Sequence, residues 1–402
     1  MLQEFDPIIR EHVRRITNDE LHVHYLGHKI LNELILDLAQ EIKKEIIKKI
    51  KEAKYYSIIL DCTPDTSHQE QMSMIVMYLN FSGNSITVEE FFLSFLNVND
   101  TTGKGLFDVT IEELKSLDLE IDDNRGQGFD NGANMKGKHQ GVQKRFLDVN
   151  PRAFYTPCGC HSLNLTLCWS LKPLSQTCWE SRVESIKAIR MQLADVNIVS
   201  KKLQSNDMHL DIAIKEINGL IDYFKGYREA GYSKAIDEAK EIASEMDIPP
   251  IFPEKRLIRR KKRVDESSSS EEVSFTNEEN FRVNFFSYVV DKAISSLEMR
   301  FEQFKDYERL FGFLFPHKLS GIEEKELKLF CHQLENALKF EERSDIDAEE
   351  LYMELKPFNT LQTSEFSNPI DVLKYLKELG CYQNACIAYR ILFTVPVTVV
   401  SA

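Results

Sequence analysis

Cysteine is scarce in this sequence, and long apolar runs are missing from it. The chain has 8 cysteines among 402 residues. In a reducing compartment, cysteines at this density are expected to be free thiols or, where they cluster, metal ligands rather than disulfides. No stretch approaches the roughly 18 consecutive apolar residues of a membrane-spanning helix, so we expect no membrane span. The first 20 residues lack the apolar segment and small-residue cleavage site of a secretory signal, which predicts an intracellular protein.

Basic residues are also in deficit. The chain has 50 lysine and arginine residues against 64 aspartate and glutamate residues, which gives a formal net charge of -14. Phosphate binding depends on clustered positive charge, so any contact with nucleic acid has to be local. With 43% hydrophobic and 10% aromatic residues the chain can bury substantial cores, and its length suits two domains of ordinary size.

The first part of the chain alternates between helical and strand patterns. Apolar residues at helical spacing predict a long amphipathic helix over 28–53, and apolar runs bounded by turn residues predict strands after it. The sequence FSGNS is a hairpin signal between two of these strands. The expected order is β-β-β-α-β-α-β-α, a mixed α/β sheet whose first three strands form an antiparallel meander. The expected elements are strands 55–61, 71–80, 85–96 and 153–158, a short strand starting near residue 124, and helices 103–117, 138–149 and 160–171.

From about residue 180 the pattern is almost entirely helical. Pro249, Pro250 and Pro253 end a first group of helices. Residues 252–275 hold a basic run and a serine-rich acidic tract with almost nothing to bury, which predicts a disordered loop. The aromatic segment LFGFLF at 310–315 is expected to be core rather than interface. Helices are expected at 181–203, 209–230, 234–246 and 284–304, and with interruptions up to 374–395.

The basic run in the predicted loop has three interpretations: a nuclear import signal, a contact with the DNA backbone, or a solvated charged loop. The tract Ser267–Ser270, followed by Glu271 and Glu272, is similar to an acid-directed phosphorylation site, which would weaken a phosphate contact. We predict that the run is a nuclear import signal. The expected location is the nucleus, with the cytoplasm as a second location. The import candidates are Lys255, Arg256, Arg259, Arg260, Lys261, Lys262 and Arg263.

Two acidic residues are candidates for chemistry. Asp61 is expected to end the first strand and Asp130 to end the fourth. If those strands are neighbours, the two carboxylates converge at one edge of the sheet. Hard oxygen ligands of this kind hold the metal ions of a phosphoryl-transfer site. The alternative is that each aspartate is a turn or cap residue; Asp65, in the turn after Pro64, is interpreted in that way.

Cysteine and histidine gather in one short segment. Cys158, Cys160, His161 and Cys168 form the densest such group in the chain. A zinc site needs four ligands in tetrahedral geometry, typically as two spaced pairs. Because Cys160 and His161 are adjacent, they point to different sides of a helix, and packing is favoured over zinc binding.

Two motifs resemble a known family. GQGFDNGANMKG, and the step from Cys158 to His161 followed by SLNL, are similar to the ribonuclease H-like core of the hAT transposase superfamily. The resemblance is to the branch of transposon-derived zinc-finger MYM-type and related proteins. TCWESRVESIKAIR at 177–190 and VPVTVVSA at 395–402 also resemble that family, so the similarity extends over nearly the whole chain.

The resemblance implies roles for individual residues. Asp61 and Asp130 correspond to the first two catalytic acids of the family, which bind Mg²⁺ or Mn²⁺ when the enzyme is active. Cys158 and His161 correspond to a structural step at a strand-to-helix junction, and Trp179 belongs to the Trp-Glu-Ser-Arg motif.

The chain also departs from the family pattern. The third acid is a glutamate just beyond a segment like VPVTVVSA, and it is expected to be missing because the sequence stops at Ala402. Only 17 residues separate His161 from Trp179, which is expected to be an internal deletion. An N-terminal zinc finger is also expected to be absent.

These observations predict four regions: an N-terminal helical segment at 1–54, a ribonuclease H-like core at 55–172, a helical insertion at 173–365, and the start of a dimerisation region at 366–402. The predicted function is that of a domesticated or degenerate transposase-like nuclear protein without catalysis. It would act through protein contacts or weak DNA binding, with DNA, a second copy of the chain or related hAT-derived proteins as candidate partners. No small-molecule substrate and no membrane partner are expected.

Two alternatives stay open. One is a metal-dependent nuclease or strand-transfer enzyme that uses Asp61 and Asp130, with Glu113 on a predicted helix as a substitute third acid. Glu112 and Glu113 are otherwise expected to lie on a solvated helix face. The other alternative is a fragment that folds poorly and exposes apolar surface.

Overall fold

The computed structural model describes residues 7–21, 28–64, 70–83, 85–170, 196–205, 208–252, 276–360, 366 and 368–397. The chain divides into two compact units that meet between Lys54 and Tyr55. The first unit contains helix α2 (Pro7–Thr17) and helix α3 (His28–Ala53), and the bounds of α3 are those that the amphipathic pattern predicted. No helix among the described residues is long and apolar enough to cross a membrane.

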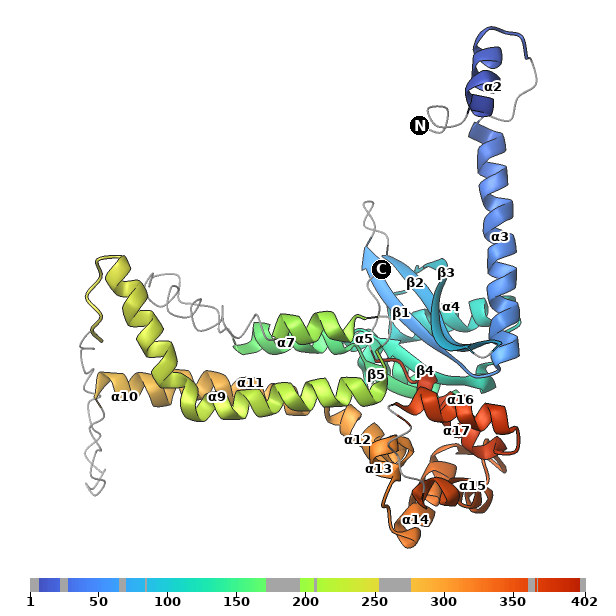
Figure 1. Cartoon of the computed structure of the whole chain (residues 1–402). Helices are drawn as coiled ribbons and strands as arrows, with labels where there is room; N and C mark the ends of the chain where they lie inside the picture. The colour runs from blue at the N-terminus through green and yellow to red at the C-terminus, as the bar shows by residue number, and fades with distance from the viewer. Residues whose placement is uncertain are drawn as a thin grey trace. The chain divides into compact units, whose positions relative to one another are not determined.

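The second unit is built on a five-stranded sheet (Figure 1). The strand order is β3-β2-β1-β4-β5, in which β1, β2 and β3 are antiparallel neighbours while β4 and β5 run parallel to β1. This mixed sheet, with its antiparallel meander of the first three strands, confirms the predicted fold class. The strands are β1 (Tyr56–Pro64), β2 (Glu70–Ser82), β3 (Ser85–Asn97), β4 (Asn124–Phe129) and β5 (Phe154–Pro157).

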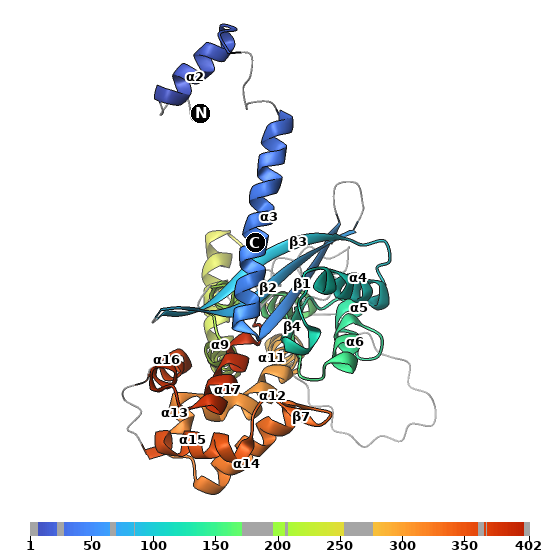
Figure 2. The same cartoon turned by 90° about the vertical axis from the view of Figure 1, so that its right-hand side faces the viewer.

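Helices from different parts of the chain cover the two faces of the sheet (Figure 2). On one face, Phe129 of β4 packs near Phe146, which in turn makes an edge contact with Phe107. On the other face, Ile59 and Met77 join one apolar cluster with the helices that follow residue 158. The first face is covered by α4 (Gly103–Ser116) and α6 (Val142–Val149), with the short α5 (Ala133–Lys136) between them, and α17 (Gln383–Thr394) contacts β2 and β4.

Apart from the short two-stranded sheet of β6 (Lys339–Phe340) and β7 (Arg343–Ser344), the rest of the second unit that the structure describes is helical, as the sequence predicted. The stretches expected at 209–230 and 234–246 form one continuous helix, α9, and the helix expected over 284–304 is broken at Phe301. The last predicted stretch is divided at Gly380, whose φ of 69° lies in the left-handed region that glycine adopts without strain. The helices are α7 (Gly159–Ser170), α9 (Leu210–Glu245), α10 (Asn277–Phe281), α11 (Tyr288–Arg300), α12 (Glu302–Phe311), α13 (Pro316–Leu319), α14 (Glu324–Ala337), α15 (Ala348–Thr360) and α16 (Pro369–Leu379).

The aromatic segment after Arg309 is core, as predicted. Phe311, Phe313, Leu314 and Phe315 are all at most 3% exposed. They belong to the same apolar cluster as Ile59 of the sheet, so the helical region and one face of the sheet share a core.

A buried ion pair also attaches the helical region to the sheet. Arg125 of β4 is 1% exposed, and its guanidinium donates two hydrogen bonds to the carboxylate of Asp345, at 2.7 Å from Nε and 2.6 Å from the terminal nitrogen. Arg152 approaches the same carboxylate at 3.4 Å, and Arg125 lies over the ring of Tyr55. A paired, hydrogen-bonded arginine of this kind is tolerated in a core, whereas an isolated charge is not.

Candidate metal-binding edge of the sheet

The parallel pairing of β1 and β4 brings Asp61 and Asp130 to neighbouring positions. The last residues that the two strands pair are Leu60 and Phe129, and the two aspartates are the next residues along each chain. The prediction that Asp61 ends its strand is wrong in detail, because β1 continues to Pro64 against β2 after its pairing with β4 has stopped. Asp61 and Asp130 nevertheless follow the last residues that these two neighbouring parallel strands pair.

The pKa of Asp61 responds to several neighbouring groups. Asp61 is half-buried, and burial is the largest cause of the rise in the pKa of its carboxyl group. The negative charge of Asp130 and the Cys158 side chain raise this pKa further, while His161 lowers it. A second carboxylate and a histidine are therefore close enough to Asp61 to change its ionisation.

Local hydrogen bonds fix the loop that carries Asp130. Its Oδ1 accepts a hydrogen bond from the backbone amide of Gly132 at 3.0 Å, which closes a tight turn after β4. The next residue, Asn131, donates to the Ser162 hydroxyl at 3.1 Å and accepts from the Lys136 ammonium at 3.2 Å. These residues belong to the motif GQGFDNGANMKG, so the motif builds the loop as well as supplying an acid.

Cys158 and His161 connect β5 to α7 at the same edge. The backbone amide of Cys158 donates to the carbonyl of Phe129 at 2.9 Å, and the Cys158 side chain is 1% exposed. A side-chain hydrogen bond with Cys158 is the largest cause of the raised pKa of His161, and the charges of Asp61 and Asp130 add to it. His161 is thus placed to carry a positive charge beside the two acids.

The alternative considered for the cysteine and histidine segment is a zinc site. In the part of the chain that the structure describes, no group of three histidine, cysteine, aspartate or glutamate side chains is placed to hold a metal ion. The Cys160 thiol is directed to the carbonyl of Ser200 at 3.5 Å. The side chain of Cys168, the whole of Asp65 and Trp179, and the predicted import run at 255–263 lie outside the described residues.

The segment after α17 runs along β4 toward this edge. A side chain at Gly126 would meet the carbonyl oxygen of Thr394 at 2.6 Å, and one at Gly128 would meet Pro396 at 3.2 Å. A side chain at Gly159 would lie 3.3 Å from the carbonyl oxygen of Val397. The segment therefore passes successive positions of β4 and then the start of α7. Glycine is needed at 126 because any side chain there would displace this segment.

Lysine and arginine side chains near the edge were not predicted from the sequence. Lys136 is half-buried, and its pKa is lowered by burial and then by the charges of Arg300 and Lys138. Arg300 of α11 donates to the Ser296 hydroxyl at 3.1 Å. Lys136 stands in the family-like motif and could have been noticed there, but Arg300 comes from a helix far along the chain and nothing in its own segment marks it.

The side chains at the edge suit one hard divalent cation. Mg²⁺ is commonly bound by one or two carboxylates, with water in its other positions, and Asp61 and Asp130 provide two. Glu113 of α4 does not join them, because its carboxylate accepts a hydrogen bond from Ser94 on β3 at 2.9 Å. The groups that shift the pKa of Asp61 come from β4, β5 and α7 and not from α4.

The sheet order, the parallel pairing of β1 with β4 and the acid pair at their ends define a ribonuclease H-like domain. Residues 8–141, about a third of the chain, match the family model DUF4371, the RNase-like domain of ZMYM1 and FAM200. Over these residues the chain is similar to the RNase-like domain of transposon-derived, ZMYM1/FAM200-like proteins, in agreement with the resemblance that the motifs carry.

Two curated relatives agree with this family. Both are named 52 kDa repressor of the inhibitor of the protein kinase, one from Homo sapiens and one from Mus musculus. Each is 27% identical over 132 residues, which is 32% of this chain and 17% of the relative. The aligned part therefore spans only about a sixth of the length of these relatives.

Proposed function

We propose that this chain is a domesticated transposase-like nuclear protein that binds DNA weakly and locally and does not cut it. Its acid edge would hold a divalent cation through Asp61 and Asp130. The observation that carries this proposal is the register of β1 and β4, which places these two acids side by side without a third acidic ligand among the described residues.

Charge distribution supports a local contact with the DNA backbone. The chain as a whole is acidic, so a uniform phosphate-binding surface is excluded. Lys136, Lys138 and Arg300 are near enough to one another for their charges to act on Lys136. A divalent cation on the neighbouring carboxylates would add positive charge and reduce their repulsion of a phosphate.

The proposal that the chain does not cut DNA rests on the number of acidic ligands among the described residues. A two-metal site stabilises both the attacking and the leaving oxygen of a phosphodiester, and it needs more carboxylate oxygens than two aspartates share. A bound ion would supply electrostatic attraction for a phosphate. Asp61 and Asp130 would hold that ion, and His161 would stabilise the pair of acids when no ion is bound.

The proposed nuclear location rests on two observations. The relatives carry the word repressor in their names, and the basic run at 255–263 is a candidate import signal. A fusion of the full chain to a fluorescent protein should gather in the nucleus. Replacement of the seven basic residues of the run by glutamine should release it to the cytoplasm, and an unchanged distribution would contradict import through this run.

DNA binding can be tested by fluorescence anisotropy with a labelled duplex. We expect micromolar or weaker binding that falls as salt is raised from about 50 to 200 mM. Lys136→Ala and Arg300→Ala should each weaken it about threefold or more, whereas Lys104→Ala, on the exposed surface of α4, should not. If no salt-dependent binding is found with the folded chain, the DNA proposal is wrong and a protein partner becomes the better hypothesis.

Catalysis is tested separately with supercoiled plasmid and Mn²⁺. We expect no nicking above that of the Asp61→Asn/Asp130→Asn double variant. Nicking that the parent performs and the double variant does not would establish the nuclease alternative.

A further inference from the structure

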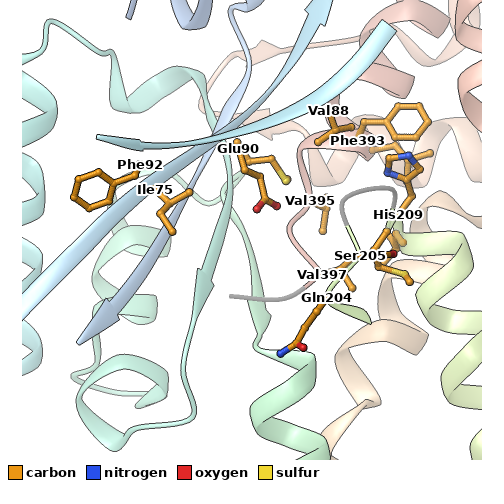
Figure 3. A pocket seen from close by; sticks show the side chains of 14 residues that line it. Ile75, Val88, Glu90, Phe92, Gln204, Ser205, His209, Phe393, Val395 and Val397 are labelled. Atoms are coloured by element: carbon orange, nitrogen blue, oxygen red, sulfur yellow. The ribbon is translucent and has the colours of Figure 1, made fainter. Parts of the chain in front are cut away.

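A cavity lies beside the segment that follows α17 (Figure 3). Its volume is about 290 Å³, and it is enclosed by β2, β3, the start of α9, the end of α17 and the segment up to Val397. The lining is mostly apolar, including two phenylalanines, Phe92 and Phe393. Glu90 and His209 are the titratable side chains among its lining residues.

Glu90 is the unusual member of this lining. It projects from β3 into the cavity (Figure 3), and among the described residues it has no hydrogen-bond or ion-pair partner. Glu90 is exposed at the open side of the cavity, and desolvation by the surrounding protein nevertheless raises its pKa to about 7. Burial is the one cause of this rise, so no neighbouring charge compensates the carboxylate.

The neighbouring acid on the same strand shows the contrast. Glu89 points to the opposite face of β3, where its carboxylate accepts a hydrogen bond from the Tyr78 hydroxyl at 3.0 Å and another from the Asn80 amide. Two successive glutamates on one strand therefore differ in their contacts: the Glu89 carboxylate accepts two hydrogen bonds, and the Glu90 carboxylate faces the cavity.

We propose that this cavity binds a small molecule that has an apolar body and a primary ammonium group. The ammonium group would pair with Glu90, and the apolar body would contact Phe92, Phe393 and the valines of the C-terminal segment. A carboxylate without a partner in a largely apolar cavity provides the polar contact that orients such a ligand, and aromatic rings add attraction for a cation. The proposal is independent of the cation and DNA proposals for the acid edge.

Binding should depend on pH in a defined direction. The amine pairs with the ionised form of Glu90, so binding strengthens as the pH rises through about 7. His209 is the other titratable group of the lining, and its ring makes an edge contact with Phe393.

The test uses 2-phenylethylamine and its neutral analogue 2-phenylethanol, measured by ligand-observed NMR titration of the full chain. We expect millimolar binding of the amine, at least about threefold tighter at pH 8 than at pH 6. Glu90→Gln should weaken the amine about tenfold and leave the alcohol unchanged. Glu89→Gln, the matched control on the opposite face, should leave both unchanged.

Two results would overturn the proposal. One is a folded parent chain, verified by circular dichroism, that shows no binding of the amine at pH 8. The other is binding of the amine that Glu90→Gln does not weaken, which would mean an apolar site without a role for the carboxylate. A failure of this kind would leave Mn²⁺ binding and DNA binding at the acid edge unaffected, so the two proposals can fail separately.

Discussion

The acid edge and the Glu90 cavity both adjoin one short segment, residues 395–397, and each raises the pKa of a carboxyl group in a different setting. At the edge, burial is the largest cause of the raised pKa of Asp61, and a histidine, a second acid and a cysteine also act on it. In the cavity, desolvation acts on the pKa of Glu90 without a neighbouring charge. The family motifs mark the first region, and no motif marks the second. The comparison shows that the pKa of a carboxyl group can be raised in a cluster of titratable side chains or at a single carboxylate without charged neighbours.

The largest expected effect comes from the ion pair that holds the sheet and the helical region together. Asp345→Ala leaves Arg125 buried and unpaired, which should lower the free energy of unfolding by about 3–5 kcal/mol. The acid edge and the Glu90 cavity are both built from residues of the sheet and of the helical region, so ligand binding at both should be lost in this variant. Urea unfolding followed by circular dichroism measures the change.

The control for this variant is Asp306→Ala, which removes an ion pair with Arg309 at 2.7 Å on the exposed surface of α12. It should change the free energy of unfolding by less than about 1 kcal/mol. Equal effects of the two substitutions would show that the sheet and the helical region are not joined as described.

An intermediate effect on stability is expected at the C-terminal segment, which adjoins both the acid edge and the Glu90 cavity. Gly126→Ala places a methyl group against the Ser57 hydroxyl and the carbonyl of Thr394. It should destabilise the chain by about 1–3 kcal/mol and displace the segment that adjoins both regions. Thermal unfolding provides the measurement. The matched change Gly219→Ala, in open space on α9, should instead stabilise the chain by up to about 1 kcal/mol. If Gly126→Ala is as well tolerated as Gly219→Ala, the C-terminal segment does not lie on β4.

The smallest expected effect isolates Glu90. A folded-state pKa raised above the unfolded value means that stability is complete below the unfolded pKa and is lost as the pH rises through the folded one, here from about 4.5 to about 7. Glu90→Gln should therefore leave the melting temperature at pH 4 nearly unchanged and raise it at pH 8, corresponding to about 1 kcal/mol after allowing for solvent in the cavity. A melting temperature that rises equally at both pH values would contradict an isolated, ionisable Glu90.

Much of the sheet and the acid pair could be predicted from the sequence. The strand periods, the hairpin signal and the motif GQGFDNGANMKG act locally, so they can be identified without the rest of the chain. The extension of β1 beyond Asp61 could not be predicted, because it depends on pairing with β2 alone. The breaks at Phe301 and Gly380 interrupt patterns that remain apolar across them, so periodicity does not reveal them.

The remaining features depend on contacts distant in sequence. Arg300 comes to the acid edge from a helix more than a hundred residues away, and the Glu90 cavity is formed by strands, helices and a C-terminal segment together. The alternation of β3 identifies which residues share a face, but it cannot identify which of two adjacent glutamates faces an apolar space.

The most direct test of the acid edge is isothermal titration of Mn²⁺ into the full chain and its Asp61→Asn and Asp130→Asn variants, with Glu90→Gln as the control. Asp61 and Asp130 are expected to act together on one ion, so each substitution should weaken binding at least about tenfold. Glu90→Gln should bind Mn²⁺ as the parent does. A folded parent that does not bind Mn²⁺, or binding that survives both aspartate substitutions, would contradict a cation site at the ends of β1 and β4.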